Sequence, residues 1–225
     1  ALIFTIDQIK SQILKLAIVY DIMQNMTTKI IFVTGNKYKV DVARKSLVGS
    51  GIELVQKKME TPEIQSGSVE EIAAFSAKWA ADSLNKPAVV SDGGCHIEAL
   101  NGFPGPFIKY VNKWLSAENM INLMRGETNR RVMWSDCIAY CEPGKKPKTF
   151  VCNFRGEVAT KAGKVMFRKD YGFIDTIFIP KGHLKTLSEL PMKDYLNFWT
   201  MPEGDDNWPR LGEYLKKRVE TKIKS

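Results

Sequence analysis

Three segments of the chain place charged or flexible residues directly after apolar runs. The first is Thr34-Gly35-Asn36, with Lys39 three residues later. A turn that exposes backbone N–H groups before a helix N-terminus binds anions, and a lysine in the first helical turn can reach a bound phosphate. The segment is not a Walker loop, because the required glycine spacing is absent. Taken alone, it also fits an ordinary strand-to-helix turn with a surface lysine.

The second segment supplies carboxylates. Asp92 follows the apolar run 88–91 and precedes two glycines, and Glu63 stands beside a proline. Mg²⁺ usually takes one or two carboxylates together with phosphate oxygens of a substrate. If the two side chains converge, they predict a magnesium-dependent polyphosphate site. The alternative is that Asp92 caps a turn and that Glu63 is solvated.

The third segment is a loop rich in glycine and proline, Asn101 to Pro106, followed by Lys109 at the start of a predicted helix. The glycines and prolines fix the shape of the loop, and Lys109 could add a further charged contact to a phosphate. As a single motif it is a structural loop.

Alternating strands and helices must position these segments. The sequence predicts strands over 29–34, 52–56, 88–91, 131–141, 149–159 and 173–179. It predicts helices over 37–48 and 68–84, helical segments that follow the loop 101–106 and end at about 124, and a last helix from 209 onward. Ser68 and Glu71 form the signature of a capping box. The pattern indicates an α/β fold with a mixed sheet, flanking helices and two lobes about a cleft, where ligands bind at the carboxyl ends of strands.

Residues 1–28 differ from the rest and predict an amphipathic helical extension before a domain over 29–225. Two histidines argue against a His-rich metal centre or a His-based triad, and four cysteines are too few for a disulfide scaffold. A reduced cytoplasmic protein without a membrane span is expected. The net charge of +8 suits a polyanion, either a triphosphate or nucleic acid, but charge balance alone rarely identifies a ligand, and solvated surface and tail lysines also account for it.

In order and spacing, the three segments resemble the inosine triphosphate pyrophosphatase family from about Lys29 to Leu190. Tyr171-Gly172-Phe173-Ile174-Asp175 is similar to the segment that surrounds the nucleoside in that family. The resemblance implies an elongated mixed β-sheet flanked by helices, a homodimer, and a nucleoside triphosphate held in the central cleft. It also implies hydrolysis of ITP, dITP and XTP to the monophosphate and pyrophosphate, keeping mutagenic nucleotides out of nucleic acid.

The same resemblance gives roles to individual residues. Glu63 and Asp92 would hold Mg²⁺, and Asp92 would also orient or deprotonate the attacking water, while cations would neutralise the triphosphate. The substrate contacts that it implies are Thr34, Gly35, Asn36, Lys39, Gly93, Lys109, Tyr171, Gly172, Phe173, Asp175 and Lys193.

The chain also departs from the family. Val42 replaces a usual glutamate, Ser76 replaces a lysine with Lys78 two residues later, and the late Ser-His-Arg has no evident counterpart. Trp199 or Phe198 could stack on the base instead. These departures, with the N-terminal helix, resemble versions encoded in polyproteins of plant potyvirus-like viruses. Two alternatives stay open: a relative that binds nucleic acid or a partner with little turnover, and an enzyme of altered substrate range.

Overall fold

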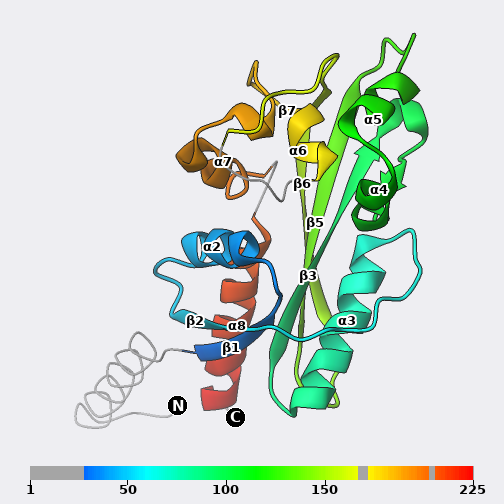
Figure 1. The fold of residues 1–225 in the computed structure, drawn as a ribbon. Coiled ribbons are helices and arrows are strands. Elements are labelled where there is room, and N and C mark those ends of the chain that lie inside the picture. The colour runs from blue at the N-terminus through cyan, green and yellow to red at the C-terminus, as the bar shows by residue number, and fades with distance from the viewer. Residues whose placement is uncertain (1–27, 167–171, 203–205, 225) are drawn as a thin grey trace, which may run out of the picture.

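The computed structural model describes residues 28–166, 172–202 and 206–224. Residues 1–27 of the predicted extension lie outside this range, as does Tyr171. The described chain has an α/β fold whose three longest strands run through both lobes of an elongated molecule (Figure 1). This confirms the predicted fold class. Within these ranges, no helix has the length and apolar character needed to span a membrane.

One mixed sheet forms the framework. Its strands are β1 (Thr28–Val33), β2 (Ile52–Lys57), β3 (Ala88–Ile97), β4 (Pro104–Gly105), β5 (Arg131–Cys141), β6 (Lys148–Val158) and β7 (Phe178–Pro180). The order is β2-β1-β3-β5-β6-β7, with β4 paired to β3. The pairs of β1 with β2 and β3 are parallel, and the pairs from β3 to β7 are antiparallel. β5 and β6, which correspond to the strands predicted over 131–141 and 149–159, form an antiparallel hairpin.

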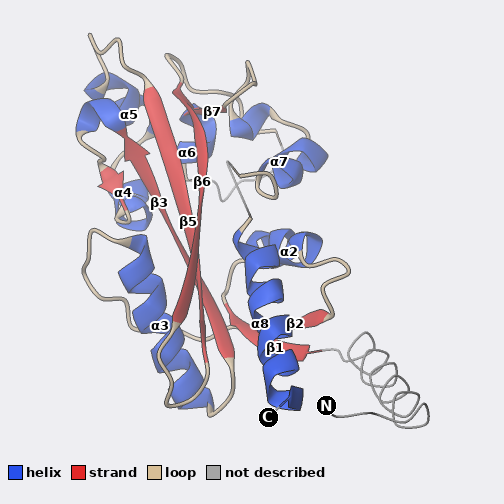
Figure 2. Ribbon diagram, turned by 180° about the vertical axis from the view of Figure 1, so that it is seen from behind, coloured by secondary structure: helices blue, strands red, loops and turns tan. Residues whose placement is uncertain are grey.

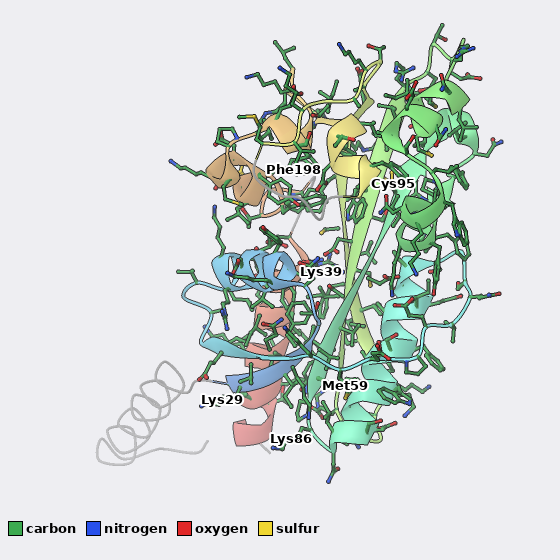
Figure 3. All side chains as sticks on the ribbon, viewed as in Figure 1. Lys29, Lys39, Met59, Lys86, Cys95 and Phe198 are labelled. Atoms are coloured by element: carbon green, nitrogen blue, oxygen red, sulfur yellow. The ribbon has the colours of Figure 1, made fainter. Side chains whose placement is uncertain are left out.

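Helices cover both faces of the sheet (Figure 2). They are α2 (Lys37–Ser46), α3 (Val69–Leu84), α4 (Ile108–Trp114), α5 (Ala117–Leu123), α6 (Phe173–Ile177), α7 (Met192–Phe198) and α8 (Asn207–Lys224), with short 3₁₀ turns at Glu98–Leu100 and Leu187–Glu189. The alanine-rich face of α3 packs on one side of the lower sheet. The other side is packed by α2 and α8. A third core lies in the upper lobe, and Lys39 lies at the level between the lobes (Figure 3).

Helix capping explains where the two helices beside the site begin. Asn36 caps α2, because its Oδ1 accepts hydrogen bonds from the backbone N–H groups of Tyr38 and Lys39. Ser68 caps α3 by accepting from the Glu71 N–H at 3.3 Å. The predicted capping box is only half formed, because the Glu71 carboxylate accepts from Ser66 Oγ at 2.6 Å.

Two predicted boundaries are wrong. The strand that was expected to end at Ser91 continues to Ile97, because β5 pairs with it along its whole length. Gly93 lies in this strand under the ring of Trp134, where an added Cβ would lie 2.8 Å from Cζ2, so the glycine serves close packing rather than a turn. Residues 173–177 form a helix, and only 178–180 form a strand. A short apolar run cannot be assigned to helix or strand by its periodicity.

The edge of β3 opens where its parallel neighbour ends. Within the described residues, the pairing of β1 with β3 ends at Phe32 and Val89, after Ile31 and Ala88, and β4 joins the same edge only at Cys95 and His96. Between these points Ser91, Asp92 and Gly93 have β5 on one side only. Since β1 turns away into α2, both faces of the sheet are accessible at this gap, and the cleft forms here.

Candidate active site

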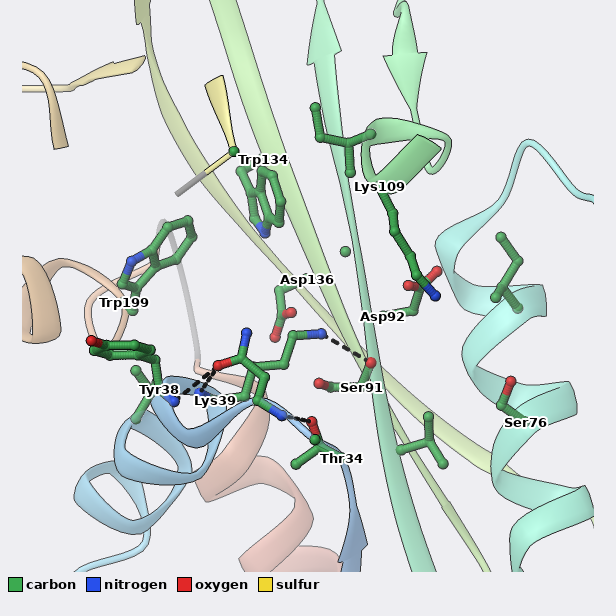
Figure 4. A pocket seen from close by; sticks show the side chains of 18 of the residues that line it. Thr34, Tyr38, Lys39, Ser76, Ser91, Asp92, Lys109, Trp134, Asp136 and Trp199 are labelled. Carbon is green, nitrogen blue, oxygen red and sulfur yellow. Dashed lines mark hydrogen bonds between the residues drawn. The ribbon is translucent and has the colours of Figure 1, made fainter. Parts of the chain in front are cut away.

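The cleft has a volume of about 920 Å³ and is lined by residues from both lobes and both faces of the sheet (Figure 4). It brings together ten of the residues predicted from sequence: Thr34, Gly35, Asn36, Lys39, Glu63, Asp92, Gly93, Lys109, Gly172 and Asp175. Phe173 is buried in the core behind the cleft, and Lys193 is exposed on α7 and does not line it. Segments far apart in sequence therefore converge on one site.

The loop from Thr34 to Asn36 uses much of its hydrogen-bonding capacity internally. Asn36 N–H donates to Thr34 Oγ1 at 3.1 Å, while the Asn36 side chain accepts from the first N–H groups of α2. The backbone anion site at this helix end is thus partly occupied by its own side chains. Lys39 supplies the charge instead, and its Nζ donates to the Ser91 carbonyl on the open edge of β3 at 3.1 Å.

Burial and the neighbouring Lys39 ammonium have opposing effects on the pKa of the Asp92 carboxyl. Burial raises its pKa above the ordinary value, and the Lys39 ammonium and the Gly93 N–H partly offset this effect, while Glu63 and Asp136 add to it. Its Oδ2 is buried and has no hydrogen-bond partner among the described residues. A carboxylate in this state suits a proton acceptor or a cation ligand.

A second charged group lies on the α3 side of the cleft. Lys109 Nζ is 2.7 Å from Glu63 Oε1, and the Tyr110 hydroxyl donates to Glu63 Oε2 at 3.3 Å. The hydrogen bond to Glu63 raises the pKa of Lys109, so that its charge is retained at neutral pH. The predicted phosphate ligand and the predicted metal ligand are therefore paired with each other.

The structure adds site residues that sequence reasoning missed. Asp136 on β5 lines the cleft, and its Oδ2 accepts from the Nδ2 of Asn207, a residue only 1% exposed, at 2.8 Å. Burial raises the pKa of Asp136, and Lys39 offsets part of this rise. Trp134 and Trp208 also line the cleft. Two sequence features could have indicated these residues. The two-residue alternation in 131–141 puts residues 134 and 136 on one face of a strand, and residues 207–208 stand at the start of a helix.

The upper part of the cleft is fixed by close packing. A Cβ at Gly172 would lie 2.2 Å from Asn112 Nδ2, and the Asn112 Oδ1 accepts from the Phe173 N–H at 3.1 Å. Asp175 is buried, and the Tyr195 hydroxyl donates to its Oδ2 at 3.5 Å. These contacts anchor the predicted nucleoside segment to α4 and α7.

The positions that depart from the family have plain structural roles. Val42 and Ser76 both line the cleft, and Ser76 Oγ donates to the Pro62 carbonyl at 3.2 Å, which holds the loop that carries Glu63. Lys78 pairs with Asp82 at 2.8 Å and does not line the cleft. Of the two predicted aromatic candidates, Trp199 lines the cleft, whereas Phe198 packs against Phe154 and Phe178 and does not line it.

The protein side chains of the cleft supply only part of the coordination shell that a magnesium ion needs. The described residues contain no cluster of three or more His, Cys, Asp or Glu side chains that could hold a metal. Mg²⁺ commonly takes one or two carboxylates and completes its shell with water and phosphate oxygens. The orphaned Oδ2 of Asp92 and the half-exposed carboxylate of Glu63 are hard oxygen donors of the kind this arrangement needs. All four cysteines are free, buried thiols, and burial raises the pKa of Cys137 to about 12.

Comparison with known proteins shows the family of the chain. A model of the Ham1 family matches residues 30–197. A dITP/XTP pyrophosphatase of Methanopyrus kandleri is 42% identical over 167 residues, which cover 74% of this chain and 86% of that protein. A dITP/XTP pyrophosphatase of Methanosarcina acetivorans is 44% identical over 131 residues, covering 58% of this chain and 71% of that protein.

Solved structures show the same fold at lower sequence identity. The Ham1 protein of Staphylococcus aureus superimposes with a TM-score of 0.63 at 21% identity and covers 87% of this chain and 100% of its own. A HAM1 protein of Coxiella burnetii gives a TM-score of 0.65 at 21% identity, covering 86% and 99%. The resemblance to virus-encoded versions stays a prediction.

Proposed function

The chain belongs to the Ham1 family, and from this premise we propose that it hydrolyses non-standard purine nucleoside triphosphates. The substrates are ITP, dITP and XTP, and the products are the nucleoside monophosphate and pyrophosphate. The relatives whose names describe dITP/XTP pyrophosphatases support this assignment. The observation that carries it is Asp92, a half-buried carboxylate on the open edge of β3, next to the cation Lys39. The buried Oδ2 of Asp92 has no hydrogen-bond partner among the described residues.

The reaction follows from the groups around Asp92. Water attacks the α-phosphorus, and the Asp92 carboxylate accepts a proton from it as the new O–P bond forms. The bond from the α-phosphorus to the bridging oxygen of the β-phosphate breaks, and pyrophosphate leaves with the electron pair. Lys39 and Lys109 stabilise the charge that builds on the leaving group. Each such contact is typically worth about 3 kcal/mol of barrier.

We propose Mg²⁺ as the cofactor, with Glu63 and Asp92 as its protein ligands. The ion would neutralise phosphate charge and help to orient the triphosphate. In this proposal, the Lys109 ammonium leaves Glu63 and pairs with a phosphate when the nucleotide binds. The 2.7 Å contact between Lys109 and Glu63 supports the exchange, since it keeps both groups at the mouth of the cleft with their charges balanced.

Replacing Glu63 by glutamine is expected to raise the Mg²⁺ concentration needed for half-maximal turnover by about tenfold or more, because a neutral amide is a weaker ligand for a hard cation. The measurement is a magnesium titration of pyrophosphate release from ITP. Glu53→Gln is the matched control, because Glu53 pairs with Lys29 outside the cleft. An unchanged magnesium requirement in Glu63→Gln would remove Glu63 from the cation site.

The base preference is tested by steady-state pyrophosphate release from ITP, XTP, dITP, ATP and GTP. Selective turnover of ITP, XTP and dITP is the expected result. Equal turnover of all five would be consistent with the proposed phosphate chemistry but would reject the selective removal of non-standard nucleotides. No release from any of the five, with folded protein, would reject the enzyme and favour a nucleic-acid- or partner-binding relative.

We also propose a cytoplasmic homodimer. The support is the exposed aromatic side chains outside the cleft on α3 and α4, Phe75 and Trp114, which are 43% and 73% exposed. Exposed aromatic groups of this kind are enriched in subunit interfaces. Sedimentation velocity is expected to give twice the chain mass, and a particle of 25.5 kDa would contradict the dimer.

A further inference from the structure

The face of β5 that lines the cleft carries two polar groups side by side. Trp134 and Asp136 are two residues apart on one strand, so their side chains share a face with about 7 Å between their Cα atoms. Gly93 lies opposite Asp136 in the register of β3 and β5. A Cβ at Gly93 would lie 2.8 Å from Trp134 Cζ2 and 3.1 Å from its Nε1. The indole can lie over this strand only because residue 93 is glycine.

This packing directs the Trp134 indole nitrogen into the cleft above the Asp136 carboxylate (Figure 4). The indole N–H is a donor only, and an ionised carboxylate is an acceptor only. Neither Trp134 Nε1 nor Asp136 Oδ1 has a hydrogen-bond partner among the described residues, and neither is among the buried unpartnered atoms. The cleft therefore presents one free donor beside one free acceptor.

The acceptor is held in place from behind. Asp136 Oδ2 accepts from Asn207 Nδ2 at 2.8 Å, and Asn207 is 1% exposed at the start of α8. Because one oxygen is engaged by this amide, the rotation of the carboxylate is restricted and Oδ1 is the oxygen left for a ligand. The Trp134 ring is fixed by an edge contact with Trp199 at 5.6 Å between centroids. Both groups are thus preorganised.

A neighbouring donor and acceptor complement the edge formed by N1 and position 6 in 6-oxopurines, but not the same edge of adenine. Hypoxanthine and xanthine carry an acceptor at O6 next to a donor at N1–H. Adenine carries the reverse pattern, a donor amine at position 6 and an acceptor at N1. Placing adenine against this pair would oppose acceptor to acceptor and donor to donor. Sites built on such pairs discriminate strongly, because a wrong ligand leaves buried polar groups unpaired.

We propose that Trp134 and Asp136 read the 6-oxo edge of the base, with the Trp134 N–H donating to O6 and Asp136 accepting from N1–H. Asn207 is a positioning residue for Asp136. The inference rests on the proposed function and names the residues that separate ITP and XTP from ATP. Guanine carries the same edge, so this pair does not reject GTP.

The test compares the ratio of kcat/KM for ITP to kcat/KM for ATP in wild type, Asp136→Asn and Trp134→Phe. An amide at position 136 can turn an N–H toward N1, and phenylalanine at 134 keeps a ring without a donor. The ratio is expected to fall by about 10- to 100-fold in Asp136→Asn and by about tenfold in Trp134→Phe. Since each variant is compared with its own rate on ATP, a partial loss of folded protein cancels.

Asp82→Asn and Trp79→Phe make the same chemical changes outside the cleft and are expected to keep the wild-type ratio. The affinities of IMP and AMP, measured by calorimetry, give a readout that does not depend on turnover. Wild type should prefer IMP, and Asp136→Asn should lose this preference. A protein that prefers IMP but hydrolyses no triphosphate would reject the proposed function and keep this inference. Selective hydrolysis of ITP with unchanged ratios in both variants would overturn the inference and keep the function.

Discussion

Replacing Asp92 by asparagine is expected to lower kcat for ITP by about a thousandfold or more. Asparagine keeps the size of the side chain but cannot accept the proton of the attacking water. A positioned general base typically contributes about 10²- to 10⁴-fold, and loss of a cation ligand adds to the effect. KM should change less, because most of the binding groups stay in place. Pyrophosphate release under saturating ITP measures the loss.

The same substitution separates catalysis from stability. Burial raises the pKa of Asp92, so the ionised carboxylate destabilises the folded chain at pH values above that pKa. Asp92→Asn removes this charge and is expected to unfold at the same temperature as wild type or a higher one. The control Asp82→Asn breaks a surface pair with Lys78 and should keep full activity. A rate within threefold of wild type in Asp92→Asn would remove Asp92 from the mechanism.

Replacing Lys39 by methionine is expected to reduce kcat/KM for ITP by about 100- to 1,000-fold. The Lys39 ammonium is the cation that offsets the charge of both Asp92 and Asp136, and it donates to the Ser91 carbonyl beside them. Methionine keeps most of the chain length and removes the charge. Phosphate binding and the ionisation of Asp92 are therefore weakened together.

This double role predicts a shift in pH dependence. Wild-type activity should fall as the pH drops through the raised pKa of Asp92, because the protonated carboxyl cannot accept a proton. Lys39 lowers that pKa, so its removal should move the acidic limb of the kcat/KM profile to higher pH. Lys37→Met is the matched control, since Lys37 is exposed on the same helix and does not line the cleft. An acidic limb that stays in place or moves to lower pH would contradict the pairing of Lys39 with Asp92.

Much of the site could be predicted because its residues follow strands or begin helices. Thr34 to Lys39 lies after β1, and Glu63 lies in the long loop after β2, while Asp92 lies on the parallel neighbour β3. In an α/β sheet these positions converge at the carboxyl ends of the parallel strands. The identity of the chemical groups was therefore readable in sequence, whereas the convergence of Glu63 and Asp92 on one cleft is seen only in the fold.

The rest of the site depends on contacts between distant segments. The pairing of Asp136 with Asn207 joins β5 to the start of α8 across 71 positions, and no local pattern predicts it. The two glycines after Asp92 predict a turn, because glycine favours turns when its neighbours are unknown. Only the approach of Trp134 shows that Gly93 is needed for packing within a strand. The partnership of Lys109 with Glu63 likewise required the fold.

The most direct test of the account is to incubate the wild-type chain with ITP and Mg²⁺ and to identify the products. We expect IMP and pyrophosphate in equal amounts, with no IDP or orthophosphate, because water attacks the α-phosphorus beside Asp92. In ¹⁸O-labelled water the label should appear in IMP. Formation of IDP and orthophosphate, or label in pyrophosphate instead of IMP, would contradict the account.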